Sequence, residues 1–325
     1  MPMMTLPAAT RLRGRNLLSI IDLAPDELLS LIGIAQQLKA AGRAQLEFLR
    51  GKTLAMLFEK PSLRTRVSFE VAMTQLGGHA IAATGGEFLV GSRETPEDAA
   101  RALSRFVDAV VIRTHAHEPL QRFAASATVP TINGLSAMAH PCQALADMLT
   151  IKERFGTLAG LRIAYVGDGR NNVAHSLGEA AAMCGMSITF AAPITHRPPD
   201  FFLARLVELG KPHHVTARAF TSPIRAVRDV DAVYTDVWTS MGDEGLVERN
   251  AAALAPYQVD AALMAAAAPH ALFMHCLPAH RGEEVSAAVI DGAQSVVFDQ
   301  AENRLHAQKA LLLALLTDLR GLGDA

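Results

Sequence analysis

Short apolar segments alternate with helix-like segments along most of this chain, and this order limits its fold more than any other feature. In the first half we predict strands at 54–58, 108–114 and 129–135, among helices at 25–41, 65–76, 96–106 and 118–127. The predicted strands are apolar on both faces, which is typical of parallel sheets covered by helices. The chain is therefore predicted to be an α/β protein.

A second series of strands and helices follows a long predicted helix at 140–156. We predict strands in the segments 161–166, 186–193, 215–221, 231–238, 271–276 and 295–300. A chain of 325 residues is too long for one ordinary core. The prediction is two doubly wound parallel-sheet domains with an interdomain cleft, linked by long helices. The boundaries are 1–147, with a C-terminal helix at about 303–323 packing back on this domain, and 148–302.

Charge and cysteine content exclude several classes of protein. The formal net charge is only −2 and half of the residues are hydrophobic, so there is neither a disordered composition nor a global field for nucleic acid or an anionic membrane. No apolar run approaches the roughly 20 residues that span a bilayer. The three cysteines are widely spaced, which favours a reducing cytoplasmic setting over a disulfide framework.

Three cations gather at the start of the helix that follows the first strand. The segment FEKPSLRTRVSF, residues 58–69, places Lys60, Arg64 and Arg66 there. Each cation at a helix N-terminus costs about 0.3–1 kcal/mol. With Ser62 as N-cap, the same residues form a site for a phosphate or a similar dianion. The alternative is that the arginines are solvated or paired with neighbouring glutamates.

Other polar side chains follow later strands of the first half. Arg113 follows DAVVI, the apolar part of the strand at 108–114, so its guanidinium should emerge at the carboxyl edge of the sheet. His140 and Gln143 lie at the N-cap and N3 positions of the helix that has Pro141 in its first turn. A glutamine at N3 also suits a capping box, so this pair by itself indicates only a helix start.

The segment GDGRNN, residues 167–172, follows a strand and opens a helix. It resembles a dinucleotide-binding loop, but Asn172 stands where the third glycine belongs, and no acidic residue ends the next strand. A nicotinamide-dependent dehydrogenase is therefore disfavoured. Asn171 and Asn172 instead place neutral amides at the sheet edge.

Asp236 and Cys276 end two later strands. Each has a structural explanation, because an aspartate often caps a turn and a buried cysteine is usually inert. A nucleophilic cysteine needs a positioned base, which the local sequence lacks. His275, Cys276 and His280 make a poor zinc set, because adjacent strand residues face opposite sides. We predict no metal and no cofactor.

Taken together, these motifs are far more specific than each one alone. SLRTR, Arg113, HPCQ, DVWTSMGDE, HCLP and AENR occur in this order over about residues 14–320. The set resembles the transcarbamylases. S-x-R-T-R and H-P-x-Q are shared with the aspartate enzymes of the superfamily, whereas the SMG loop and HCLP resemble the ornithine carbamoyltransferases.

The resemblance assigns roles to individual residues. It implies that carbamoyl phosphate is bound by Ser62, Leu63, Arg64, Thr65, Arg66, Arg113, His140, Gln143, Cys276, Leu277 and Arg304. It implies that ornithine is bound by Asn172, Asp236, Ser240 and Met241. The catalytic residues would be Arg113, His140, Asp236 and Cys276. The cations at the helix start would then neutralise the phosphate of carbamoyl phosphate.

The activity that the resemblance implies is carbamoyl transfer to the δ-amine of L-ornithine, giving L-citrulline and phosphate. The family also implies a homotrimer or a multiple of trimers. Arginine biosynthesis is the role we expect, with a catabolic role left open by the sequence, and the cysteine pattern favours the cytoplasm. One alternative is a sister transcarbamylase acting on putrescine or an N-acylated ornithine. Another is a catalytically inactive scaffold subunit, although such a chain would be expected to lose Arg64, His140 or Cys276.

Two positions depart from the family pattern. Leu63 follows the serine where the family usually has threonine or methionine, which is tolerable if this position contributes its backbone N–H. Leu89 stands where a glutamine is common, which removes one polar contact expected for the carbamoyl group.

Overall fold

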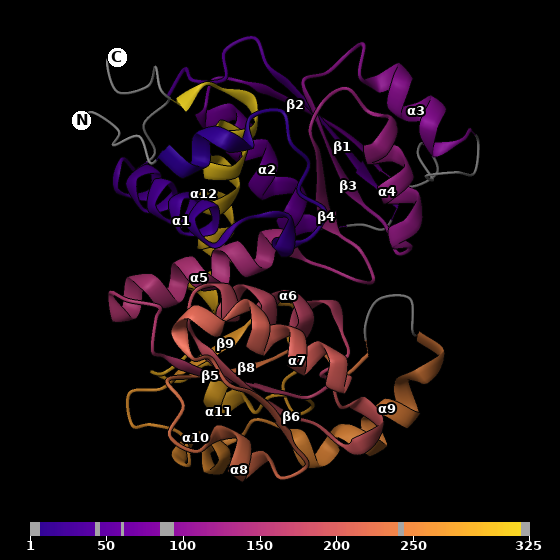
Figure 1. Ribbon diagram of the computed structural model, residues 1–325. Coiled ribbons are helices and arrows are strands. Elements are labelled where there is room, and N and C mark those ends of the chain that lie inside the picture. The colour runs from indigo at the N-terminus through magenta and orange to yellow at the C-terminus, as the bar shows by residue number, and fades with distance from the viewer. Residues whose placement is uncertain (1–6, 43–45, 60–61, 85–93, 240–243, 320–325) are drawn as a thin grey trace. The chain divides into compact units, whose positions relative to one another are not determined.

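The computed structural model describes residues 7–42, 46–59, 62–84, 94–239 and 244–319 (Figure 1). The chain divides into two compact units, the first formed by Met1–Leu149 with Glu302–Ala325 and the second by Thr150–Ala301. These divisions fall within two continuous helices, α5 (Pro141–Phe155) and α12 (Val297–Leu316).

The first unit contains a four-stranded parallel sheet in the order β2-β1-β3-β4. Its strands are β1 (Thr53–Phe58), β2 (His79–Thr84), β3 (Ala109–Arg113) and β4 (Thr131–Leu135). Its other helices are α1 (Pro25–Ala40), α2 (Leu63–Gln75), α3 (Pro96–Leu103) and α4 (His117–Ser126). Short 3-10 helices at Pro7–Leu12 and Ile20–Asp22 precede α1.

The second unit contains a five-stranded parallel sheet in the order β7-β6-β5-β8-β9. Its strands are β5 (Arg162–Val166), β6 (Ser187–Ala191), β7 (Ala217–Phe220), β8 (Ala232–Thr235) and β9 (Leu272–His275). The helices are α6 (Asn172–Met183), α7 (Asp200–Leu209), α8 (Pro223–Val227), α9 (Val247–Leu254), α10 (Ala261–Ala265) and α11 (Ala287–Ile290). Short 3-10 helices span Ile194–His196, Lys211–His213, Glu244–Leu246 and Ala255–Tyr257. The predicted α/β class with two parallel sheets is confirmed.

Burial explains why the apolar segments form the central strands. All residues of β1 except Thr53 are buried, and Phe58 at its end is fully buried. Complete burial of a side chain of this size contributes about 1.5–3 kcal/mol. In the second unit Val166, Val233 and Phe273, from three neighbouring strands, belong to one buried cluster. Each sheet is thus held by its own apolar core.

The end of α2 depends on a glycine. Gly77 follows the last turn with φ +81°, and a Cβ there would lie 2.9 Å from the Cα of Glu47. A side chain at this position would meet both a strained backbone and a steric clash, so glycine ends the helix. The helix begins at Leu63, two residues before the predicted start, with Ser62 as its N-cap.

Two strand assignments need correction. Residues 295–300, predicted as a strand, form only a bridge from Ser295 to Phe273 before α12 begins at Val297. Val296, Val297 and Gln300 are buried, whereas Phe298 is 69% exposed, so burial follows the three-to-four-residue spacing of a helix. Strand β2 was not predicted, because its alanine-rich sequence HAIAAT has weak strand propensity and it forms the edge of its sheet.

The order of the strands brings the predicted functional segments to two positions. In the first sheet β2 lies on one side of β1 and β3 lies on the other, so the strand order reverses between β1 and β3. In the second sheet it reverses between β5 and β8. In open parallel sheets the carboxyl ends of strands at such a reversal form the usual ligand-binding crevice. The residues after β1 and β3, and those after β5 and β8, include most of the predicted site.

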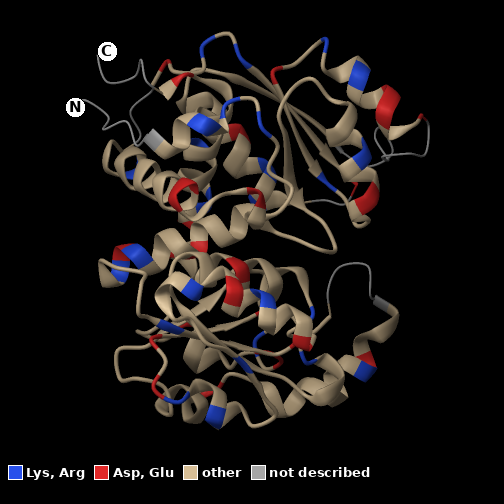
Figure 2. Cartoon of the chain, in the orientation of Figure 1, with Lys and Arg blue, Asp and Glu red and all other residues tan. Residues whose placement is uncertain are grey.

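Charged side chains of both signs are distributed over the elements of each unit. Lys and Arg are scattered among acidic residues in the view of Figure 2 rather than gathered on one face. Within the described residues, no helix is both long and apolar enough to cross a bilayer.

Candidate active site

The first group of predicted site residues surrounds the start of α2. Arg64 is exposed there and has no ion-pair partner within the described residues, and the Leu63 side chain is 77% exposed. Arg66 donates from Nε to Glu70 Oε1 at 2.9 Å, in a pair of partly exposed side chains. Exposed pairs of this kind contribute little. The alternative that these arginines pair with neighbouring glutamates is therefore correct for the Nε of Arg66. Lys60 lies outside the described residues.

Three helices meet at Arg304, which is 4% exposed. Its Nη1 donates to Gln143 Oε1 of α5 at 2.8 Å, and its Nη2 donates to Thr65 Oγ1 of α2 at 3.2 Å. The Gln143 amide also donates to the buried carboxylate of Asp147 at 2.8 Å. Gln143 thus links a cation to an acid, which is a different role from the capping-box alternative. The structure brings together three predicted residues from distant parts of the sequence.

Buried His140 precedes α5 and lies in the field of two arginines. Burial is the main cause that lowers the pKa of His140 well below its ordinary value, and the charges of Arg304 and Arg113 add to it. The imidazole is therefore neutral at pH 7 and donates from one nitrogen only. Arg113 is the last residue of β3 and is half-buried. A neutral donor beside two fixed cations suits an oxygen that gains negative charge.

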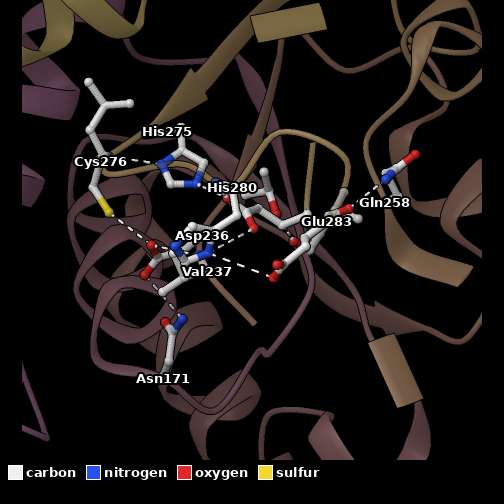
Figure 3. A network of polar contacts seen from close by, with 12 residues as sticks. Asn171, Asp236, Val237, Gln258, His275, Cys276, His280 and Glu283 are labelled. Atoms are coloured by element: carbon white, nitrogen blue, oxygen red, sulfur yellow. Dashed lines mark hydrogen bonds and ion pairs between the residues drawn. The ribbon is translucent and has the colours of Figure 1, made fainter. Parts of the chain in front are cut away.

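The second group lies in the second unit, at the ends of β8 and β9. Cys276 Sγ donates to Asp236 Oδ1 at 3.1 Å, and the same oxygen accepts the backbone N–H of Val237 at 2.8 Å (Figure 3). Asp236 therefore caps a turn and also contacts the cysteine. Because the two residues follow adjacent parallel strands, the sheet places them side by side.

Burial is the main cause that raises the pKa of Asp236, which is 7% exposed. The hydrogen bonds that Asp236 accepts from the Cys276 thiol and from the Val237 N–H oppose this rise. Cys276 is half-buried, unlike Cys142 and Cys184, where burial raises the thiol pKa to about 11 and about 12. Of the three cysteines, Cys276 is thus the least buried, and its thiol contacts a carboxylate.

His275 supports the turn that carries Cys276 and Leu277. The Leu277 N–H donates to His275 Nδ1 at 2.9 Å, so the ring proton lies on Nε2, which donates to buried Glu284 Oε1 at 3.2 Å. Leu277 has φ +59°, a conformation that costs a bulky residue about 1–3 kcal/mol. The ligand atoms of Asp236, His275 and Cys276 lie within 4.8 Å of one another. Both nitrogens of His275 are already engaged, so this set offers a metal only two ligands.

Asn172, the predicted ornithine ligand, is the first residue of α6 and is half-buried. Its neighbour Asn171 is the N-cap, is 6% exposed, and points toward Asp236 (Figure 3). For Asn171 the sequence predicts only a neutral amide at the sheet edge, although an asparagine before an apolar helix is an N-cap signal. Ser240 and Met241 lie outside the described residues, as does Leu89.

Comparison with known families gives matches over most of the chain. Residues 15–153 match the carbamoyl-P binding domain of aspartate/ornithine carbamoyltransferase, and residues 159–315 match its Asp/Orn binding domain. An ornithine carbamoyltransferase from Methanoculleus marisnigri is 50% identical over 305 residues, covering 93% of this chain and 97% of that protein. One from Hyperthermus butylicus is also 50% identical, covering 94% and 98%.

Solved structures give the same result for the fold. Ornithine carbamoyltransferase from Pyrococcus furiosus superimposes with a TM-score of 0.90 at 46% identity, covering 94% of this chain and 98% of that one. The enzyme from Thermus thermophilus gives a TM-score of 0.84 at 44% identity, covering 93% and 99%. With both domains matched and nearly the full length aligned, the chain belongs to the aspartate/ornithine carbamoyltransferase family.

Proposed function

We propose that this protein is an ornithine carbamoyltransferase, which transfers the carbamoyl group of carbamoyl phosphate to the δ-amine of L-ornithine. The observation that carries the proposal is the Asp236–Cys276 pair, 3.1 Å apart, in a chain about 50% identical to ornithine carbamoyltransferases over nearly its whole length. A thiol and a buried carboxylate at adjacent strand ends suit an ammonium group that must be oriented and deprotonated.

Carbamoyl phosphate is assigned to the first unit. The exposed Arg64 and the N–H groups at the start of α2 provide a site for its phosphate dianion. Arg113, neutral His140 and Thr65, whose hydroxyl is held by Arg304, surround the carbamoyl oxygen in this proposal. The contacts of Cys276 and Leu277 with carbamoyl phosphate stay predictions.

Ornithine is assigned to the second unit. By comparison with lysine, its δ-ammonium has a pKa near 10.4, so it must lose a proton before it attacks. Asp236 and Cys276 orient the amine and assist this proton loss. The nitrogen lone pair then forms a bond to the carbamoyl carbon, and the carbonyl electrons move to oxygen. When the tetrahedral intermediate collapses, the C–O bond to phosphate breaks, phosphate leaves with that electron pair, and the attacking nitrogen gives its second proton to the departing phosphate. The products are citrulline and phosphate.

An assay with three amine acceptors tests the proposal. Purified protein is incubated with carbamoyl phosphate and either L-ornithine, putrescine or N-acetylornithine, and the ureido product is measured. We expect turnover with ornithine at a kcat/KM at least about a hundredfold above the other two, because a site built for a free α-amino acid leaves polar groups unpaired with either analogue. Preferential turnover of putrescine or N-acetylornithine would identify a sister transcarbamylase instead.

The contribution of the thiol is tested by Cys276→Ala. We expect a higher KM for ornithine and a kcat reduced by roughly tenfold, but not abolished, because Asp236 remains to hold the amine. Cys142→Ala is the matched control, since this thiol is buried and its Sγ contacts the Asn133 carbonyl oxygen at 3.7 Å in the first unit. Wild-type kinetics for the Cys276 variant would leave that residue as a packing group.

The cellular setting is a further part of the proposal. The three cysteines are all free, which supports a reducing cytoplasm. We place the enzyme in arginine biosynthesis, where it should restore growth without arginine to a strain that lacks ornithine carbamoyltransferase. Family membership supports a homotrimer, so light scattering should give three times the 34.7 kDa chain mass or a multiple of that value. Absence of rescue or a monomeric mass would contradict these assignments.

A further inference from the structure

The Asn171 side chain has a defined partner at each end of its amide. Its Oδ1 accepts the backbone N–H of Ala174 at 2.7 Å, which caps α6. Its Nδ2 donates to the Tyr165 hydroxyl at 2.7 Å and to Asp236 Oδ2 at 3.4 Å. A flipped amide would oppose N–H to N–H and oxygen to oxygen, so one orientation is strongly favoured.

Tyr165 is a rigid anchor for this amide. It is fully buried in β5, and its ring stacks on that of Tyr234 in the neighbouring β8, with centroids 5.9 Å apart and planes 22° apart. Burial, reinforced by the charge of Asp236, raises the pKa of Tyr165 well above its ordinary value. The hydroxyl therefore keeps its proton, and its oxygen remains an acceptor for Asn171.

The two oxygens of Asp236 have different surroundings. Oδ1 accepts from Val237 and Cys276, whereas Oδ2 accepts from the Asn171 side chain. The carboxylate can turn only about its Cβ–Cγ bond, and the donor on Oδ2 adds to the two donors on Oδ1 in limiting this rotation. The 3.4 Å contact is long, so its geometry depends on how firmly Asn171 is held.

We propose that Asn171, anchored by the Tyr165 hydroxyl, is a positioning residue that holds the Asp236 carboxylate in the orientation required to receive the ornithine amine. The inference rests on the proposed role of Asp236. In this proposal Tyr165 and Asn171 do not touch the substrate, but they set the direction of the Asp236 carboxylate, which does. The sheet makes this possible, because Tyr165 lies in β5, Asp236 directly follows the paired strand β8, and Asn171 is the N-cap of the helix that follows β5.

Two substitutions separate positioning from helix capping. Asn171→Ser keeps a side-chain oxygen for the Ala174 N–H but removes the amide donor, and serine is as good an N-cap as asparagine. Tyr165→Phe removes the anchor while Asn171 remains. Tyr257→Phe is the matched control. The hydroxyl of this buried residue donates to the Thr221 carbonyl oxygen at 2.8 Å in the same unit and has no bond to Asp236 among the described residues.

The readouts are kcat, the KM for each substrate, thermal stability and the dependence of kcat on pH. We expect kcat/KM for ornithine to fall about tenfold to a hundredfold in Asn171→Ser and in Tyr165→Phe, with KM for carbamoyl phosphate unchanged. The titratable groups that act on Asp236 are Tyr165, His275, Cys276 and Glu284. Both variants lose or weaken a hydrogen bond to the ionised Asp236 carboxylate, which raises the pKa of Asp236. The acidic limb of the kcat profile should therefore move to higher pH.

The outcomes distinguish this inference from the proposed function. Tyr257→Phe should lower the Tm while leaving the pH profile of kcat unchanged. Wild-type kcat and pH profile in both Asn171→Ser and Tyr165→Phe would overturn the positioning role, provided that Asp236→Asn is inactive. If Asp236→Asn itself keeps full activity, the proposed function of Asp236 fails first. Should Asn171→Ser not fold, Tyr165→Phe still decides the question.

Discussion

Replacing Arg64 with alanine should reduce kcat/KM for carbamoyl phosphate by about a hundredfold to a thousandfold, with little effect on folding. The expected loss follows from removing one charged donor that faces the phosphate as negative charge develops. The side chain is exposed, and it is a cation at a helix N-terminus, where it opposes the helix dipole. The Tm of the ligand-free variant should therefore be unchanged or slightly higher.

Steady-state kinetics and thermal unfolding with and without inorganic phosphate measure these two effects. Phosphate should raise the Tm of the wild type by mass action, and this rise should be largely lost in the variant. Arg101→Ala is the control, because Arg101 is 68% exposed in the same unit and pairs with Asp98 at 3.0 Å. Wild-type kinetics for Arg64→Ala would remove the helix start from the binding site.

Asp236→Asn should reduce kcat by about a hundredfold to ten-thousandfold while the protein stays folded. Asparagine has nearly the same shape and can still accept the Val237 N–H, but it can neither hold an ammonium group by charge nor accept its proton. Burial raises the pKa of Asp236, so the ionised carboxylate costs folding free energy once the pH exceeds its ordinary value. Asparagine removes this cost, which is larger than the loss of the long, 3.4 Å hydrogen bond from the Asn171 amide.

The sign of the stability change can be checked with pH. At neutral pH the Tm of Asp236→Asn should equal or exceed that of the wild type. At a pH below the ordinary pKa of aspartate this advantage should disappear, because the wild-type carboxyl is then protonated in both folded and unfolded states. Asp260→Asn is the control, since Asp260 caps α10 by accepting the Leu263 N–H at 2.8 Å and asparagine caps equally well. Undiminished kcat for Asp236→Asn would exclude it from catalysis.

The fold was predictable because burial leaves a strong periodic signal. The strand that became β1 is apolar on both faces, and the helix at 25–41 was placed to within one residue of the observed Pro25–Ala40. The errors occur where that signal is weak. An edge strand rich in alanine carries little of it, and the apolar segment 295–300 is too short to distinguish strand from helix.

The candidate site was only partly predictable, because a motif names residues but not their partners. Gln143 was interpreted from local position as a possible cap, yet its amide contacts Arg304, which lies 161 residues away in sequence. For Arg66 the sequence left two interpretations, an anion-binding site or a pair with a glutamate. The structure shows that Arg66 Nε pairs with Glu70. Asn171 had no assigned role, although its amide contacts Asp236.

The sequence by itself determined the α/β class, the two parallel sheets and the family. The order of apolar segments predicted the fold, and the cations at one helix start together with the short motifs indicated the family. These features depend on residue type and local spacing, which a sequence records directly. Only the tertiary structure decided that Arg304 joins Thr65 and Gln143, that His140 is neutral, and that Tyr165 and Asn171 contact Asp236 through a chain of hydrogen bonds. Those properties depend on burial and on distances between residues far apart in the chain, which arise only when strands pair and helices pack.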